Sequence, residues 1–184
     1  KAEDVGRIVN NGKHAVLIGM ENAFPLGENL KDVNLWAERG VRYMGITHFG
    51  HNQFGDSSNP STDRNETTSK WNGLSPLGRE LISSLNDAGI IVDVSHDAKS
   101  TMMQAADLSR VPVIASHSGI KAINDNPRNL DDEQLLKLKE TGGVVQVVAY
   151  GSYVKGFTEE QKKIEARLMS EFNVLSRSDV NGLD

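Results

Sequence analysis

Five short apolar segments recur along the chain, and stretches with helical periodicity separate or follow them. The apolar segments are His14–Met20, Val41–Ile46, Ile90–Val94, Pro112–Ala115 and Gly143–Tyr150. Short apolar runs of this kind are typical of buried strands. Strands that alternate with helices favour right-handed crossovers and a parallel sheet. The sequence therefore predicts an α/β fold with about five parallel strands in chain order and helices outside.

Helix-capping residues mark several of the segments between these strands. Ser75 followed by Pro76 is a typical helix start, and Gly89 is a typical helix end. The predicted helices are Asn29–Arg39, Pro76–Ala88, Lys99–Leu108, Asp131–Glu140 and Thr158–Leu175. The polar segment Phe49–Gly73 has 25 residues. That is too long for an ordinary connection, so we expect a functional loop.

The number of strands limits the fold further. A closed barrel of eight strands typically needs about 250 residues, whereas this chain has 184 residues and five predicted strands. A doubly wound sheet is an alternative, although no glycine-rich phosphate-binding fingerprint follows the first strand. If the fold is a barrel, we expect residues 1–184 to form a single domain that is one piece of it.

Composition excludes several classes of protein. The net charge of −5 and the pI of about 5.6 argue against a nucleic-acid-binding module. No apolar stretch approaches the roughly 20 residues of a membrane helix, so no membrane segment is expected. No signal peptide is recognisable, although the chain begins at Lys1 without a Met. The absence of cysteine removes disulfides and thiolate chemistry, and it is compatible with the cytoplasm, a bacterial periplasm or the cell surface.

Ionisable residues fall just past the ends of four successive predicted strands. They are Glu21, His48, His96 and His117. In an α/β barrel the carboxyl ends of the strands form the active-site face, so these side chains can converge there. A single Glu or His at a strand end is usually a solvated loop residue. Four in four successive units indicate a metal or acid–base site, and the residue types suit zinc.

Three other residues are weaker candidates for a functional site. His14 lies at the start of a strand, on the opposite side, and is interpreted as structural. His51 lies in the long polar loop, where a role within the loop is the simpler interpretation. Arg128 precedes the helix at Asp131 and can bind a substrate carboxylate through its planar fork. An ion pair with Asp131 or Asp132 is the structural alternative for this arginine.

Several segments resemble the membrane (renal) dipeptidase family of zinc dipeptidases. The strongest matches are VDVSH ending at His96, PVIASHS around His117, and NPRN around Arg128. The intervals also fit, with 27 residues from Glu21 to His48 and 21 from His96 to His117. The resemblance spans roughly residues 8 to 153. It implies a partial TIM barrel of the metallo-dependent hydrolase type, a dipeptide substrate and two zinc ions in the complete enzyme.

The resemblance also implies roles for matching residues. Glu21 matches a carboxylate that bridges two zinc ions, and His96 and His117 match two ligands of the second zinc. His48 matches a catalytic histidine that polarises the substrate carbonyl without binding metal. The substrate-binding residues are then His48, the carboxylate-binding Arg128 and a pocket tyrosine matched by Tyr153.

The sequence departs from the family pattern. The His-x-Asp pair of the first zinc and the late catalytic aspartate are both absent, and Asn22–Phe24 replaces a glycine-rich stretch. We therefore expect a barrel fragment without the first and last strands. It would hold at most one complete zinc site and be inactive by itself. Its open sheet edges would favour association with missing segments or another chain, and a homodimer is one such arrangement.

Two other functions remain as alternatives. One is a catalytically inactive, dipeptidase-like domain that serves in binding. The other is a barrel metallohydrolase acting on cyclic amides, in which a carboxylated lysine commonly bridges the metals. No lysine here follows a strand with suitable neighbours, which argues against the second alternative.

Overall fold

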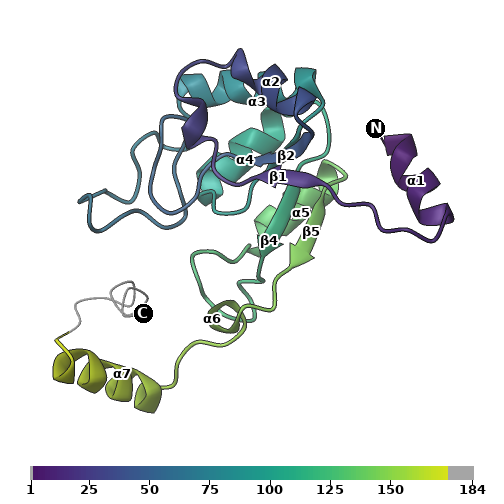
Figure 1. Cartoon of the computed structure of the whole chain (residues 1–184). Coiled ribbons are helices and arrows are strands. Elements are labelled where there is room, and N and C mark those ends of the chain that lie inside the picture. The colour runs from purple at the N-terminus through teal and green to yellow at the C-terminus, as the bar shows by residue number, and fades with distance from the viewer. Residues whose placement is uncertain (1, 174–184) are drawn as a thin grey trace.

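Five parallel strands form one sheet in the computed structural model, which describes residues 2–173 (Figure 1). The strands are β1 (Ile18–Met20), β2 (Val41–Gly45), β3 (Ile91–Asp93), β4 (Ile114–Ser118) and β5 (Val144–Val147). Their order in the sheet is β1-β2-β3-β4-β5, and every neighbouring pair is parallel. Consecutive right-handed βα units of a barrel produce this order, so the predicted fold class is confirmed.

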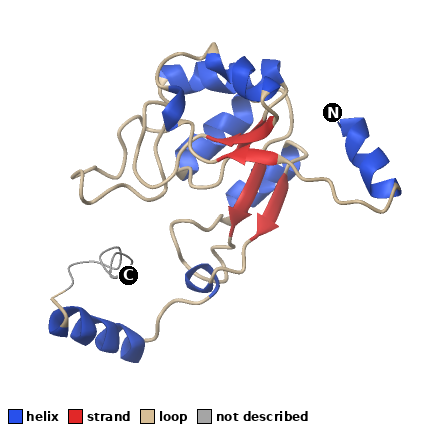
Figure 2. Ribbon diagram, in the orientation of Figure 1, coloured by secondary structure: helices blue, strands red, loops and turns tan. Residues whose placement is uncertain are grey.

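Four helices pack in succession along this sheet, and the first and last helices of the chain lie away from it (Figure 2). The helices are α1 (Ala2–Asn10), the 3₁₀ helix η1 (Phe24–Leu26), α2 (Asp32–Glu38), α3 (Pro76–Ala88), α4 (Lys99–Leu108), α5 (Asp132–Glu140), α6 (Gly151–Val154) and α7 (Glu159–Glu171). Helices α2 to α5 each contact the next, and α2, α3 and α5 contact β2, β3 and β5. The apolar core lies between these helices and the sheet. Helices α1 and α7 bury no residue.

Local sequence explains where the central helices begin and end. The Ser75 hydroxyl accepts a hydrogen bond of 2.9 Å from the Gly78 amide, and Pro76 is the first residue of α3. Gly89 ends that helix with a φ of 69°, a left-handed conformation that a residue without Cβ adopts at little cost. Asp131 and Gln134 form a capping box at the start of α5. Helices α3 and α4 have the predicted bounds.

Other element bounds differ from the prediction. Strand β1 begins only at Ile18 because it pairs with β2 alone, and the preceding Val16 is 87% exposed. His14 lies exposed before the strand. Strand β4 continues past Ala115 because Ser118 pairs with Val147 of β5. Backbone pairing, which the apolar pattern does not report, extends this strand.

Three short helices were not predicted, and α2 and α7 were predicted too long. Helices α1, η1 and α6 lie outside the predicted elements. Helix α7 begins after its N-cap Thr158, whose side chain forms a capping box with Gln161. The helix ends at Glu171, and residues 174 and 175 of the predicted helix lie outside the described residues.

The long segment between β2 and α3 is held by a buried carboxylate. Asp56 accepts hydrogen bonds from the backbone amides of Lys70, Trp71 and Gly73 at 2.8–3.1 Å. The Ser69 hydroxyl donates a further bond of 2.6 Å. These bonds draw the two halves of the segment together, so it has a defined conformation although it contains no regular element.

A second group of hydrogen bonds uses both ring nitrogens of His51. Nδ1 accepts from the Ser57 amide at 3.0 Å, so Nε2 carries the proton and donates to the Thr67 carbonyl at 2.8 Å. The Glu66 carboxylate accepts from the amides of His51 and Ser61. His51 is therefore satisfied within the loop, which supports the structural interpretation.

The Asp56→Asn variant tests the role of this carboxylate. Burial raises the pKa of Asp56, but hydrogen bonds from Ser69 and the three amides outweigh it and lower the pKa overall. A lowered folded pKa stabilises the protein above about pH 3.9, the ordinary value, and this contribution is lost as pH falls through the folded value. We expect the variant to lose about 1–3 kcal/mol of unfolding free energy at pH 7.

Urea denaturation at several pH values measures this effect. The difference between wild type and Asp56→Asn should shrink as the pH falls below about 4. The exposed Asp63, in the same loop, provides a matched control, because Asp63→Asn should leave stability unchanged. A difference that stays constant down to pH 2, or no difference at pH 7, would contradict the role of the Asp56 charge.

Candidate metal centre

Three side chains from different strand ends meet at the carboxyl edge of the sheet. Glu21 directly follows β1, His96 follows β3, and His117 lies within β4. Glu21 Oε1 is 3.1 Å from His96 Nε2 and 3.0 Å from His117 Nε2. The two Nε2 atoms are 3.0 Å apart. The three atoms thus form a nearly equilateral triangle, as the shared strand edge predicts.

The size and chemistry of this triangle suit a divalent metal. Ligands at about 2.0–2.1 Å from a tetrahedral metal are about 3.4 Å apart. The observed 3.0–3.1 Å separations are slightly shorter, so the three atoms would need to move apart by only a few tenths of an ångström. One carboxylate oxygen and two imidazole nitrogens are a common catalytic donor set. The residues present therefore fit a metal ion.

His48 lies at the edge of the same cluster. Its Nε2 is 3.8 Å from Glu21 Oε1, and its side chain is 36% exposed. Its ring centroid is 4.3 Å from that of His96. Potential ligand atoms of Glu21, His48 and His96 all lie within 4.8 Å of one another. His48 is thus close enough to act on a molecule bound beside the triangle.

The long loop fixes the backbone of both neighbouring histidines. The Ser58 amide donates to the His96 carbonyl at 2.7 Å. The Ser57 hydroxyl donates to the His48 carbonyl and lies 3.3 Å from the His96 carbonyl. His96 has a φ of 72°, an uncommon conformation for a residue with a Cβ, which these contacts help to hold. Nothing in the sequence around Ser57 indicated this role.

His96 is neutral in this environment. Burial, followed by Coulombic interactions with Arg128 and with the neighbouring His48 and His117, lowers its pKa to about 2. A neutral imidazole has a lone pair available, and metal binding requires that form. The Nδ1 atom of His96 is buried and has no hydrogen-bond partner among the described residues.

His117 is bonded differently through its second ring nitrogen. Nδ1 is 2.8 Å from the Ser116 hydroxyl, which donates to Asp93 Oδ2. Asp93 Oδ1 accepts from the amides of Ser95 and Ser116, both at 3.0 Å. Asp93 is 3% exposed. Sequence reasoning missed this residue, although a charged residue within the apolar run Ile90–Val94 was a usable signal.

Arg128 is buried and pairs with neither nearby aspartate. Its Nη2 donates to the His117 carbonyl at 3.2 Å, and its guanidinium lies 5.5 Å from the Tyr153 ring. Asp131 instead caps α5 and binds Lys99 at 2.7 Å. Among the described residues no ion pair joins Arg128 to an acid, and its Nε has no partner. Burial lowers its pKa, and interactions with Tyr153 oppose that change.

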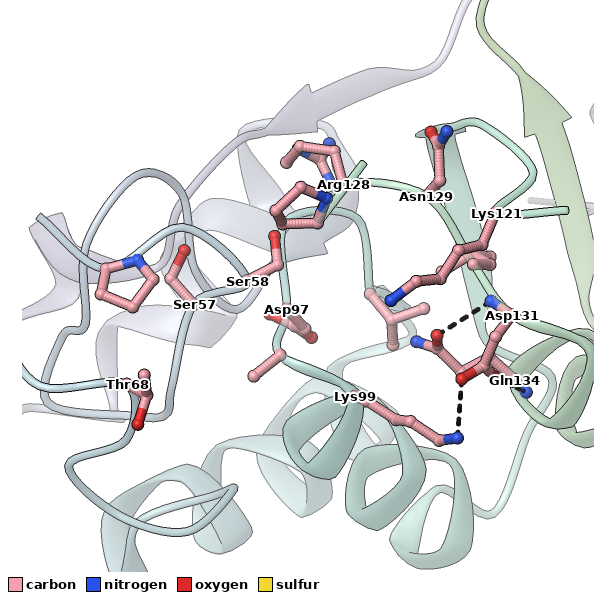
Figure 3. A pocket seen from close by; sticks show the side chains of 15 residues that line it. Ser57, Ser58, Thr68, Asp97, Lys99, Lys121, Arg128, Asn129, Asp131 and Gln134 are labelled. Carbon is pink, nitrogen blue, oxygen red and sulfur yellow. Dashed lines mark hydrogen bonds and ion pairs between the residues drawn. The ribbon is translucent and has the colours of Figure 1, made fainter. Parts of the chain in front are cut away.

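A cavity of about 270 Å³ lies between the long loop and the loops that follow β3 and β4 (Figure 3). Arg128, Asp97 and Lys99 are among its lining residues, whereas Glu21 and the three clustered histidines are not. Asp97 is buried and accepts a bond of 2.7 Å from the Thr47 hydroxyl. Burial raises the pKa of Asp97 well above its ordinary value. Arg128 connects this cavity with the cluster, because it lines the cavity and also donates to the His117 carbonyl.

Asparagine side chains attach Tyr153 to this region. The Asn129 amide donates to the Tyr153 carbonyl at 2.8 Å. The side-chain amides of Asn124 and Asn126 donate to the Ser152 carbonyl at 2.8 and 3.2 Å. These bonds hold α6 against the loop that carries Arg128. Sequence reasoning missed them, although the repeated asparagines around Arg128 were a visible signal.

Comparisons with known proteins agree with the fold and with the resemblance found in the sequence. The crystal structure of the probable dipeptidase PvdM from Pseudomonas aeruginosa has a TM-score of 0.86 and 39% identity, and the match covers 94% of this chain and 43% of that one. Dipeptidase tcpJ from Claviceps purpurea is 36% identical over 147 residues, or 80% of this chain and 33% of the relative. Dipeptidase aclJ from Aspergillus oryzae is 34% identical over 142 residues, or 77% and 32%.

This chain spans about a third of the length of those curated relatives. None of the described helices is both long and apolar enough to span a membrane. The sequence profile described as membrane dipeptidase (peptidase family M19) matches residues 1–176. The predicted resemblance is thereby confirmed, and the chain belongs to the membrane dipeptidase family, peptidase family M19.

Proposed function

We propose that the whole protein containing this chain is a zinc-dependent dipeptidase. The observation that carries the proposal is the triangle of Glu21 Oε1, His96 Nε2 and His117 Nε2, with sides of 3.0–3.1 Å. Family membership supports it, since the similar proteins are named dipeptidases. Zinc is favoured among divalent metals because two donors are imidazoles and one is a carboxylate.

Glu21, His96 and His117 hold the metal in this proposal. Bound zinc would supply Lewis acidity and lower the pKa of a coordinated water toward neutrality. Glu21 would also help to hold a second zinc, as the resemblance implies. The remaining ligands of that ion are not in this sequence, which contains no His-x-Asp pair.

His48 is assigned to the substrate carbonyl. Its ring is partly exposed at the rim of the triangle, 3.8 Å from Glu21. From this position it can donate a hydrogen bond to the carbonyl oxygen as negative charge develops there. His96 and the loop residue Ser57 hold the histidine in place through ring contact and a bond to its carbonyl.

Arg128 is assigned to the free carboxylate of the dipeptide. Arg128 is buried and forms no ion pair with an acid among the described residues, so an arriving carboxylate would be its counter-ion. The planar fork suits a bidentate carboxylate contact. Tyr153 lies over the guanidinium and would line the same subsite. Arg128 is held close to His117, so only a short substrate would contact Arg128 with its carboxylate and lie beside the triangle at the same time.

The His117→Ala variant of the whole protein tests the proposal that the triangle binds zinc for dipeptide hydrolysis. Removing a ligand should cost more than the 10- to 100-fold effect typical of a residue that only supports a ligand. We therefore expect loss of bound zinc, measured by elemental analysis, and a fall in dipeptide kcat/KM of more than about 100-fold. His14→Ala is the control, because His14 is exposed and outside the site.

Zinc binding without dipeptide hydrolysis by the wild type would contradict the enzyme proposal. That outcome would support the alternative of a catalytically inactive, dipeptidase-like binding domain. Full activity of His117→Ala would show that the triangle is not the metal site.

The His48→Gln variant separates a catalytic role from metal binding. Loss of a group that stabilises a developing oxyanion should lower kcat about 10²- to 10³-fold. Zinc content and KM should change little, because His48 is not assigned as a ligand. Steady-state kinetics and elemental analysis on the same preparation measure both. Loss of zinc together with activity would instead make His48 a ligand.

The Arg128→Met variant tests recognition of the carboxylate. A hydrogen bond to a charged group contributes enough that kcat/KM for a dipeptide should fall about 10- to 100-fold. The same dipeptide with an amidated C-terminus serves as the control substrate, since it carries no carboxylate. Wild type and variant should hydrolyse the amide equally poorly. An equal fractional loss on both substrates would refute the assignment.

A further inference from the structure

The two ring nitrogens of His117 lie in different surroundings. Nε2 is in the triangle with Glu21 and His96. Nδ1 faces the opposite way, 2.8 Å from the Ser116 hydroxyl. A neutral imidazole carries one proton, so the protein must place that proton on one of the two nitrogens. Only the form with the proton on Nδ1 leaves Nε2 free to bind a metal.

The bonds around Asp93 determine where the Ser116 proton lies. A carboxylate is an acceptor only, and Asp93 Oδ1 already accepts from the amides of Ser95 and Ser116. Its Oδ2 accepts from the Ser116 hydroxyl. Serine has a single hydroxyl proton, and this bond uses it. With that proton used, the Ser116 oxygen can only accept, so its bond to His117 requires the ring proton to be on Nδ1.

A competing acceptor for the Ser116 proton is less favourable. Ser95 Oγ is 3.5 Å from Ser116 Oγ, too long for a strong hydroxyl bond. Ser95 Oγ also accepts from the His117 backbone amide at 3.0 Å. Ser95 thus positions the backbone of His117, and Asp93 with Ser116 positions its ring.

We propose that Asp93 and Ser116 are positioning residues that set the tautomer of His117. This inference rests on the proposed metal site, and it deepens that proposal by naming what prepares one ligand. The relay runs from the Asp93 carboxylate through the Ser116 hydroxyl to Nδ1 and leaves a lone pair on Nε2. Groups that bind the second nitrogen of a metal-binding histidine commonly fix its orientation and raise its basicity.

The Asp93→Asn variant is a sharp test, because it should reverse the direction of the hydrogen bonds from residue 93 through Ser116 to His117 without removing them. The two amides that face Oδ1 require the carbonyl oxygen of an asparagine there. The NH₂ group would then occupy the Oδ2 position and donate to Ser116. The Ser116 hydroxyl would in turn donate to Nδ1 and move the ring proton of His117 to Nε2. That proton occupies the position the metal needs.

The experiment compares the whole protein with its Asp93→Asn and Ser116→Ala variants. Zinc affinity is measured by chelator competition, and the ring tautomer of His117 by ¹⁵N NMR of metal-free, histidine-labelled protein. We expect Asp93→Asn to weaken zinc binding by about 10- to 100-fold and to move the ring proton to Nε2. Ser116→Ala, which releases the tautomer without reversing it, should give a smaller loss and a mixture of tautomers.

Asp131→Asn is the control. Asp131 also accepts a backbone amide, from Gln134 at 3.0 Å, but it caps α5 and is not part of the triangle or of the bonds to His117. The variant should leave zinc affinity and the His117 tautomer unchanged. Asp93→Asn with the ring proton still on Nδ1, or with wild-type zinc affinity, would overturn the proposal.

Two further outcomes are distinguishable. If Asp93→Asn does not fold, Ser116→Ala decides the question, because a single unchanged tautomer in that variant would refute the relay. Failure of the wild type to bind zinc would refute the proposed function. If the wild type binds zinc and Asp93→Asn binds it with the same affinity, only the relay is refuted.

Discussion

Parallel pairing of the central strands is the constraint on which the site depends. Gly45 of β2 is in register with Asp93 of β3, and Asp93 with Ile114 of β4. This alignment brings the carboxyl ends of the three strands to one edge. Because side chains alternate between faces, a slip of one residue would turn Asp93 away from Ser116. The strand register that forms the core therefore also positions the hydrogen bonds between Asp93 and Ser116, next to His117.

The strands alone do not hold the histidines in place, since His48 and His96 lie beyond the strand ends. The long loop provides the remaining support through Ser57 and Ser58, which bind the carbonyls of both histidines. Its own conformation depends on Asp56, buried among the amides of residues 70–73. A segment without regular structure thus has a defined conformation, because many of its polar groups are hydrogen-bonded within the segment.

Local patterns in the sequence were sufficient to predict the order of the strands, the cap at Ser75 and the positions of Glu21, His96 and His117 near strand ends. Each of these features depends on residues that are close together in the sequence. The continuation of β4 through His117 was missed because pairing with β5 determines it. Ser57 and Asp93 were missed for a similar reason, since their partners lie about 10 to 40 residues away. The resemblance to a family supplied the roles that spacing alone left open.

The two histidines of the triangle present lone pairs for different physical reasons. Burial and neighbouring positive charge keep His96 neutral, and its Nδ1 lacks a partner among the residues described. His117 is more exposed, and its ring is directed by Ser116 and Asp93. With Glu21, three electron-rich atoms then lie about 3 Å apart. A carboxylate oxygen and two unprotonated nitrogens at that distance would repel one another, and in the proposed function a bound cation would turn that repulsion into attraction.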